Sequence, residues 1–267
     1  MIFFLLNIKM PVTKSKDIDI SEINFPNLNK KSSFQVFSLF YNNTTLYIQT
    51  PRLLSIFGMN INEYDKKKNI VATLQFNSDV DRVNRVDNYM KQIKKLDSLI
   101  KYTANKNHKT WLNTPFKIPS DSLDALYKPS LYYKKLPSGE YDHSVPPTKK
   151  VKFQIRKGEN TFELYDKDSN NITLSTFDEN IEFLEKSLEN KSVIVKCILH
   201  PTIYIVDKNF GVTYNVKAFQ LFDTYKSKKK QKATVEKKSK DINSYFASSK
   251  NDSSEDEDED ENSDNDM

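Results

Sequence analysis

Short runs of β-branched and aromatic residues occupy both halves of this chain and constrain its fold more than any other feature. The first half contains 34–41, 46–50 and 69–76, and Asn42-Asn43 predicts a turn between the first two. The second half contains 149–157, 161–165, 171–175, 192–206 and 212–222. Several antiparallel strands with few helices between them are typical of a curled sheet or a small barrel. The sequence therefore predicts a mainly β fold of the α+β kind.

One stretch has a helical period instead. Apolar residues recur there at steps of three and four, namely Val83, Val86, Met90, Ile93, Leu96 and Ile100. This spacing predicts a helix from about Asp79 to Ala104, with Ser78 as its N-cap. Shorter helices are expected near 120–127 and over 179–188. Six prolines between 115 and 147 make 105–147 a connecting insertion rather than a regular layer.

The charge of the chain is divided between two segments. Residues 252–267 hold ten of the 36 acidic residues, so the preceding 251 residues combine 41 basic with 26 acidic residues, a net charge of +15. Such a basic body suits a polyanion, since lysine and arginine at phosphates release counterions. The alternative is a lysine-rich solvated surface with an unrelated solubilising tail.

The sequence contains no motif of catalytic residues that would indicate an enzyme. The three histidines are scattered, a single cysteine lies in an apolar run, and only 4 glycines are present, with no phosphate-cradling loop. Cys197 is therefore expected to be a buried small side chain rather than a nucleophile. We expect no catalytic residues, no metal and no cofactor.

Basic and aromatic residues are interleaved in 127–135 and 149–157. Binding of single-stranded nucleic acid needs both kinds, because cations follow the phosphates while aromatic rings stack on bases. Strand alternation in the second segment predicts one face with Lys150, Lys152, Gln154 and Arg156 and an opposite, core face with Val151, Phe153 and Ile155. Tyr132, Tyr133 and Trp111 are the candidate stacking residues. The other candidate nucleic-acid-binding residues are Arg52, Arg82, Arg85, Lys128, Lys134 and Lys135.

The order of these segments resembles a known family. It comprises I-Q-T-P-R at 48–52, F-G at 57–58, K-K-L-D at 94–97, W-L at 111–112, Y-K-P-S-L at 127–131, K-V-K-F-Q-I at 150–155, C-I-L-H-P-T-I-Y-I at 197–205 and F-G at 210–211. Together these resemble the OB-fold single-stranded DNA-binding proteins of large nucleocytoplasmic DNA viruses, over about Phe34 to Phe222. The resemblance implies an OB-like antiparallel barrel with one long inserted helix, and a non-catalytic protein that coats single-stranded DNA during viral replication, repair or recombination.

The C-terminal tail contains a second resemblance. Ser239, Ile242, Tyr245 and Phe246 have the spacing of the peptide that binds the PCNA sliding clamp, with serine where that family usually has glutamine. Positions i, i+3 and i+4 share one face of a helical turn, which gives the spacing a physical reason. The resemblance implies that the aliphatic residue and the two aromatic residues fill a pocket of a clamp, and that the acidic end contacts replication proteins.

These patterns predict four segments: an N-terminal extension (1–30), an OB-like nucleic-acid-binding domain (31–225), a disordered basic linker that carries the clamp motif (226–251) and an acidic tail (252–267). The first residues lack the features of a signal peptide, and we expect no membrane span. The expected location is intracellular, at a viral replication site in the cytoplasm or the host nucleus. Two other readings stay open: a transcription accessory or RNA-binding factor, and an acidic-tailed structural or chaperone-like protein.

Overall fold

The computed structural model describes residues 11–26, 34–64, 67–81, 83–156 and 159–226. The described helices are α1 (Val83–Lys106), α2 (His108–Trp111), α3 (Ser120–Leu126) and α4 (Phe177–Leu188), with 3-10 turns η1 (Ser15–Asp17), η2 (Ile20–Glu22) and η3 (Ser78–Val80). The strands are β1 (Val12–Lys14), β2 (Ile23–Asn24), β3 (Phe34–Ser38), β4 (Phe40–Tyr41), β5 (Thr44–Thr45), β6 (Tyr47–Gln49), β7 (Leu53–Tyr64), β8 (Lys67–Gln75), β9 (Tyr127–Lys128), β10 (Thr148–Phe153), β11 (Ile155–Arg156), β12 (Glu159–Asn160), β13 (Glu163–Tyr165), β14 (Val193–Val206) and β15 (Asn209–Thr224).

Five of these strands close into a ring. β7 pairs with β8, β8 with β10, β10 with β15, β15 with β14, and β14 returns to β7. Four of the pairings are antiparallel, while β10 and β15 run parallel. A bulge in β7, where Gly58 has a φ of +64°, bends that strand as ring closure requires. The fold is therefore mainly β and OB-like, with α1 inserted between the second and third strands of the ring.

The core of this ring is formed by the alternate residues of its strands. Ile70, Ala72 and Leu74 of β8 and Val151 and Phe153 of β10 are all buried. The β10 alternation predicted from the sequence is therefore confirmed for the residues whose side chains are described. Cys197 is also buried and unpaired, and burial raises the pKa of its thiol.

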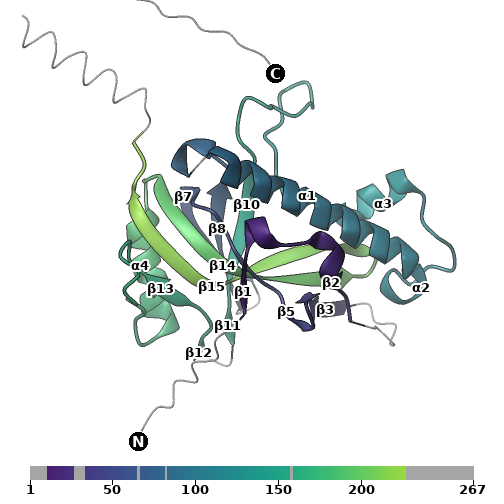
Figure 1. The fold of residues 1–267 in the computed structure, drawn as a ribbon, viewed down its shortest axis with the longest axis horizontal. Helices are drawn as coiled ribbons and strands as arrows, with labels where there is room; N and C mark the ends of the chain where they lie inside the picture. The colour runs from purple at the N-terminus through teal and green to yellow at the C-terminus, as the bar shows by residue number, and fades with distance from the viewer. Residues whose placement is uncertain (1–10, 27–33, 65–66, 82, 157–158, 227–267) are drawn as a thin grey trace, which may run out of the picture. The chain divides into compact units, whose positions relative to one another are not determined.

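The long helix α1 covers one side of the curled sheet (Figure 1). Its buried stripe includes Val86, Ile93, Leu96 and Ile100, as the helical period predicts. The predicted start of the helix is wrong, because Asn77 caps the turn η3 through its side chain and α1 begins only at Val83. In Figure 1, α2 and α3 lie beside the C-terminal end of α1.

Other predicted elements differ in detail. Asn42 and Asn43 both have positive φ angles and join β4 to β5, which confirms the predicted turn. Over 171–175 only an isolated bridge of Asn171 with Tyr165 forms instead of a strand, and the amide of Leu164 in β13 donates to the Thr173 hydroxyl at 2.8 Å rather than to a backbone carbonyl. Segment 12–24, assigned to an extension, supplies β1 to the main sheet and buries Ile18 and Ile23 in the core. The structural unit that contains all the described elements ends at Tyr225.

Candidate nucleic-acid interface

A groove of about 520 Å³ runs along the outer face of β8 and β10 and continues onto the β14–β15 hairpin. We call it the barrel groove, and its lining includes Phe34, Val36, Val71, Tyr132, Lys150, Lys152, Gln154, Thr202, Tyr204, Val206 and Thr213. In OB-folds, the face of the second and third strands and the hairpin of the fourth and fifth strands are where oligonucleotides bind. The groove therefore occupies the position at which a five-stranded ring of this type binds a nucleic-acid strand.

Two lysines of β10 supply the positive charge of the groove. Lys150 and Lys152 alternate with buried Val151 and Phe153, so the ladder that fixes the core also turns both amines outward. Antiparallel pairing sets Lys150 opposite Thr73 and Lys152 opposite Val71. The two lysines thus lie on one face of the strand, two residues apart, where both can contact the phosphates of one nucleic-acid strand.

Tyr132 lies beside this charge. Its backbone exchanges hydrogen bonds with Thr148 at 2.8 and 2.9 Å, and the residue is 45% exposed. The Lys150 Nζ lies 5.7 Å from the centre of the ring, and burial of the ring raises the pKa of its hydroxyl. An exposed ring next to an amine that is free to face phosphate can stack on a base.

The opposite wall of the groove is apolar. Phe34 is 63% exposed and pairs with Val206, while Val36 is 53% exposed and pairs with Tyr204. Large apolar side chains this exposed in a groove mark a binding surface. Tyr204 could not be identified from the sequence, because the continuous apolar run of 192–206 does not show which alternate residues point outward. Phe34 could not be identified either, because its place in the groove depends on the pairing of β3 with β14.

Gly211 lets Tyr204 of β14 and Lys128 of β9 lie close to its own backbone. A Cβ at this position would lie 2.8 Å from the Tyr204 hydroxyl oxygen and 3.0 Å from the Lys128 carbonyl oxygen. Both distances are shorter than a carbon atom tolerates, so a side chain here would push Tyr204 or β9 away. Gly211, from the F-G pair at 210–211, therefore leaves room for the groove residue Tyr204.

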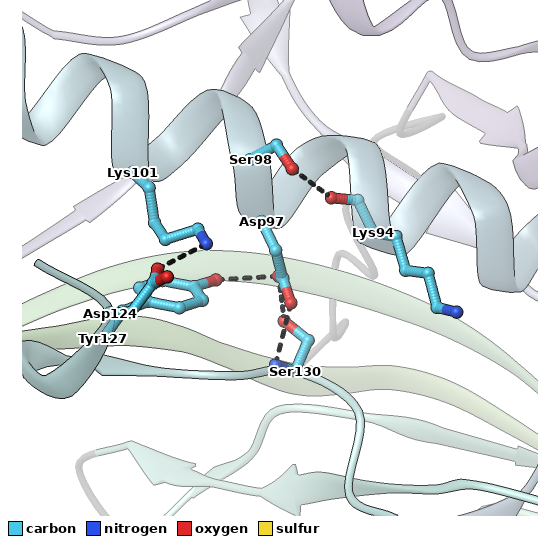
Figure 2. A network of polar contacts seen from close by, with 7 residues as sticks. All are labelled: Lys94, Asp97, Ser98, Lys101, Asp124, Tyr127 and Ser130. Carbon is cyan, nitrogen blue, oxygen red and sulfur yellow. Dashed lines mark hydrogen bonds and ion pairs between the residues drawn. The ribbon is translucent and has the colours of Figure 1, made fainter. Parts of the chain in front are cut away.

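A polar network anchored in α1 fixes the segment that carries Tyr132 (Figure 2). The Asp97 carboxylate accepts hydrogen bonds from the Tyr127 hydroxyl at 2.7 Å, the Ser130 amide at 3.0 Å and the Ser130 hydroxyl at 2.6 Å. Ser130 also lies 3.2 Å from the Tyr214 hydroxyl, and both residues line the groove. Burial, followed by the charge of Asp97, raises the pKa of Tyr127, so its hydroxyl stays protonated and donates.

A buried lysine lies under the groove. Lys149 has no exposed surface, and its Nζ lies 2.7 Å from the centre of the Tyr214 ring and 5.6 Å from that of Tyr89. The described residues provide no hydrogen-bond acceptor for this nitrogen. Burial lowers the pKa of Lys149, and the negative charge of Asp97 acts in the opposite direction. Lys149 therefore belongs to the support of the groove and not to its binding surface.

The remaining predicted residues fall into separate places. Arg52 and Arg85 lie together in a different cleft. Lys128 is exposed on β9, which pairs with β15 at Gly211. On the loop that follows Tyr132, the Tyr133 ring packs on Tyr141 and His143, Lys134 pairs with Asp142 at 3.8 Å, and Lys135 lies over Tyr141.

Trp111 has to be removed from the candidate interface. It is only 2% exposed and packs edge-on against Phe25 and Phe37, at 5.7 and 5.0 Å between ring centres. An indole enclosed in this way has no free face for a base. Outside the described residues or side chains lie Arg82, Arg156, Ser239, Ile242, Tyr245 and Phe246.

Within the described residues, histidine, cysteine and acidic side chains form no group of three that could hold a metal ion. Over the same ranges, no helix has the length and apolar character needed to cross a membrane.

Comparison with known proteins gives structural similarities only. The chain is similar to the single-stranded DNA-binding protein from bacteriophage Enc34 in complex with ssDNA, with a TM-score of 0.42 and 11% identity, over 71% of this chain and 92% of that one. It is also similar to gp2.5, a single-stranded DNA-binding protein encoded by bacteriophage T7, with a TM-score of 0.40 and 11% identity. This similarity covers 68% of this chain and 93% of gp2.5. The sequence matches no protein-family model and no curated protein.

Proposed function

We propose that this chain binds single-stranded DNA in the barrel groove without catalysing a reaction. The observation that carries the proposal is the joint presence, on one outer face of the ring, of Lys150 and Lys152 with the exposed rings of Tyr132 and Phe34. Amines on a strand follow a phosphate backbone, and rings stack on bases whatever the sequence. Stacking on these rings needs unpaired bases, so the binding of duplex DNA is favoured by the charge of the lysines alone.

Fluorescence anisotropy tests this proposal with labelled ~20-nucleotide single-stranded DNA, the matching duplex and the matching RNA. We expect single-stranded DNA to bind at least about tenfold more tightly than the duplex, since one stacked base contributes ~1–3 kcal/mol. Affinity should fall steeply with salt. Equal or tighter binding of the duplex would contradict the proposal, and tighter binding of RNA would favour an RNA-binding or transcription role instead.

The setting we propose is replication, repair or recombination of a large DNA virus, at its replication site inside a cell. A protein of this kind coats strands exposed at a fork and needs contact with the replication machinery. The sequence motif at Ser239, Ile242, Tyr245 and Phe246 supports a tether to a PCNA-like sliding clamp, and the acidic residues of 252–267 support contacts with further replication proteins.

Calorimetry with a peptide of residues 237–250 and the sliding clamp of the same replication system tests this tether. We expect saturable heat that disappears when Tyr245 and Phe246 are both changed to alanine, because the two rings fill the pocket. A peptide with Ser239→Gln serves as the positive control and should bind more tightly. Absence of heat at high micromolar concentration from both peptides would end the idea.

A further inference from the structure

A second hollow on the molecule carries more positive charge than the barrel groove. It has a volume of about 680 Å³ and lies where β1, β6 and β14 meet the start of α1. Its lining includes five cationic side chains, Lys14, Lys16, Arg52, Arg85 and Lys196, and we call it the cationic cleft. The cations come from four separate parts of the chain, so the fold gathers them.

Two carboxylates in the cleft are engaged with the protein itself. The Asp81 Oδ2 accepts the backbone amide of Arg52 at 2.8 Å, and its Oδ1 lies 3.6 Å from the Arg85 guanidinium. The Asp79 Oδ2 accepts the hydroxyl of Tyr225 at 3.3 Å. Five cations against two carboxylates leave an excess of positive charge among the described lining residues.

The excess of positive charge affects the pKa of Lys196. Burial lowers the pKa of its amine, and the nearby charges of Arg52, Arg85 and Lys14 lower it further, while Asp81 opposes them. A lowered pKa means that the charged form of the amine is disfavoured where it lies. A bound anion would reverse this effect, because it would place negative charge among the four cations.

The position of Arg52 in the cleft is fixed by two contacts. Its guanidinium carbon lies 4.3 Å from the centre of the Phe222 ring, and its backbone is fixed by Asp81. Stacking on a ring fixes the plane of the guanidinium while leaving its edge available, and that edge can bind two phosphate oxygens at once. The cleft is thus suited to phosphate oxygens rather than to an apolar ligand.

One strand connects the cleft to the barrel groove. Alternate residues of β14 point to the same side of the strand, so Lys196 in the cleft and Tyr204 in the groove lie on one face, with the buried Thr202 between them. They are eight residues apart, or ~26 Å along the strand. His200 lies between them in the strand. Its ring centre is 5.2 Å from that of Tyr47, and its Nε2 forms a hydrogen bond of 3.0 Å with the Ser38 hydroxyl. Burial and then the charge of Lys217 lower the pKa of His200 to about 4, so it is neutral at neutral pH.

We propose that the cationic cleft binds phosphates of the same DNA strand that occupies the barrel groove, beyond the end of the groove. This proposal rests on the proposed function, since the ligand is a single strand already held by Lys150, Lys152 and Tyr132. The cleft then extends the binding site along β14. At ~3.4 Å per nucleotide of a stacked strand, ~26 Å corresponds to about eight nucleotides. Short oligonucleotides therefore fill the groove alone, and longer ones reach both places.

The test compares oligothymidylates of ~6 and ~30 nucleotides on four forms of the full chain. These are the unchanged protein, the cleft variant Arg52→Gln/Lys196→Gln, the groove variant Lys150→Gln/Lys152→Gln, and the control Lys109→Gln/Lys117→Gln. The control removes the same charge from exposed positions that line neither the cleft nor the groove. Circular dichroism melts establish that each form is folded. If the cleft variant unfolds, Lys14→Gln/Lys16→Gln replaces it, because both of these side chains are exposed.

We expect the cleft variant to lose about tenfold in affinity for the long oligonucleotide and to bind the short one within about twofold of the unchanged protein. Loss of two phosphate contacts should also reduce the slope of log K against log salt by about 1.4 for the long oligonucleotide. The groove variant should lose affinity for both lengths.

Two results would overturn the inference while leaving the proposed function intact. In the first, the cleft variant binds both lengths like the unchanged protein. In the second, the control weakens binding of the long oligonucleotide as much as the cleft variant does, which is an effect of net charge alone. If the unchanged protein binds neither length, the proposed function fails and the inference fails with it.

Discussion

Replacing Lys150 and Lys152 together by glutamine is expected to weaken binding of single-stranded DNA about 30-fold near 0.1 M salt, or ~2 kcal/mol. Both amines face the barrel groove from β10, and each is expected to lose one charge-assisted contact to a phosphate. Glutamine keeps most of the side-chain length and the strand pairing, so the fold should persist. Anisotropy titrations at several salt concentrations measure the effect, and the salt slope should fall by about 1.4.

The matched control changes Lys134 and Lys135 to glutamine. These are also two nearby lysines, but they lie on the loop after Tyr132, where Lys134 pairs with Asp142 and Lys135 lies over Tyr141. Their loss removes the same net charge and should weaken binding less than about threefold, through long-range electrostatics alone. Equal weakening by the two double variants would show that the groove is not the site.

The sequence was sufficient to predict the parts of this site that depend on local periodicity. Alternation in 149–157 separates Lys150 and Lys152 from the core residues Val151 and Phe153, and the structure agrees. The buried face of α1 follows from a period of three and four for the same reason. Each of these predictions concerns residues within one element, whose relative directions the backbone fixes.

The sequence was insufficient wherever the answer depends on distant segments. The sequence predicts Trp111 as a stacking residue, whereas Phe25 and Phe37 enclose its ring in the fold. The groove residue Phe34 is exposed because β3 pairs with β14, some 170 residues later, as the register Phe34 with Val206 shows. Similarly, Arg52 and Arg85 do meet, but in the cationic cleft, because the Arg52 backbone amide and the Arg85 guanidinium both contact the Asp81 carboxylate beside the start of α1.

Changing Asp97 to alanine is expected to destabilise the protein by about 3 kcal/mol or more, the largest loss of stability predicted for a single residue here. The carboxylate accepts three hydrogen bonds from Tyr127 and Ser130, both of which are buried (Figure 2). Each buried donor left without an acceptor costs ~1–3 kcal/mol. The buried amine of Lys149 also loses the negative charge that favours its protonated form. Urea unfolding measures the loss as a lower midpoint with an unchanged slope.

Ser98→Ala is the matched control, because Ser98 is the next residue of α1 and donates only to the Lys94 carbonyl from an exposed position. Its effect should stay within ~0.5 kcal/mol. The loss of stability for Asp97→Asn should lie between the losses for Asp97→Ala and Ser98→Ala. The amide oxygen can still accept a hydrogen bond from Tyr127 or Ser130, but the negative charge that faces Lys149 is gone. A loss for Asp97→Ala no larger than that for Ser98→Ala would mean that the segment carrying Tyr132 is held by its strand contacts. In that case the Asp97 network would not be what positions the groove.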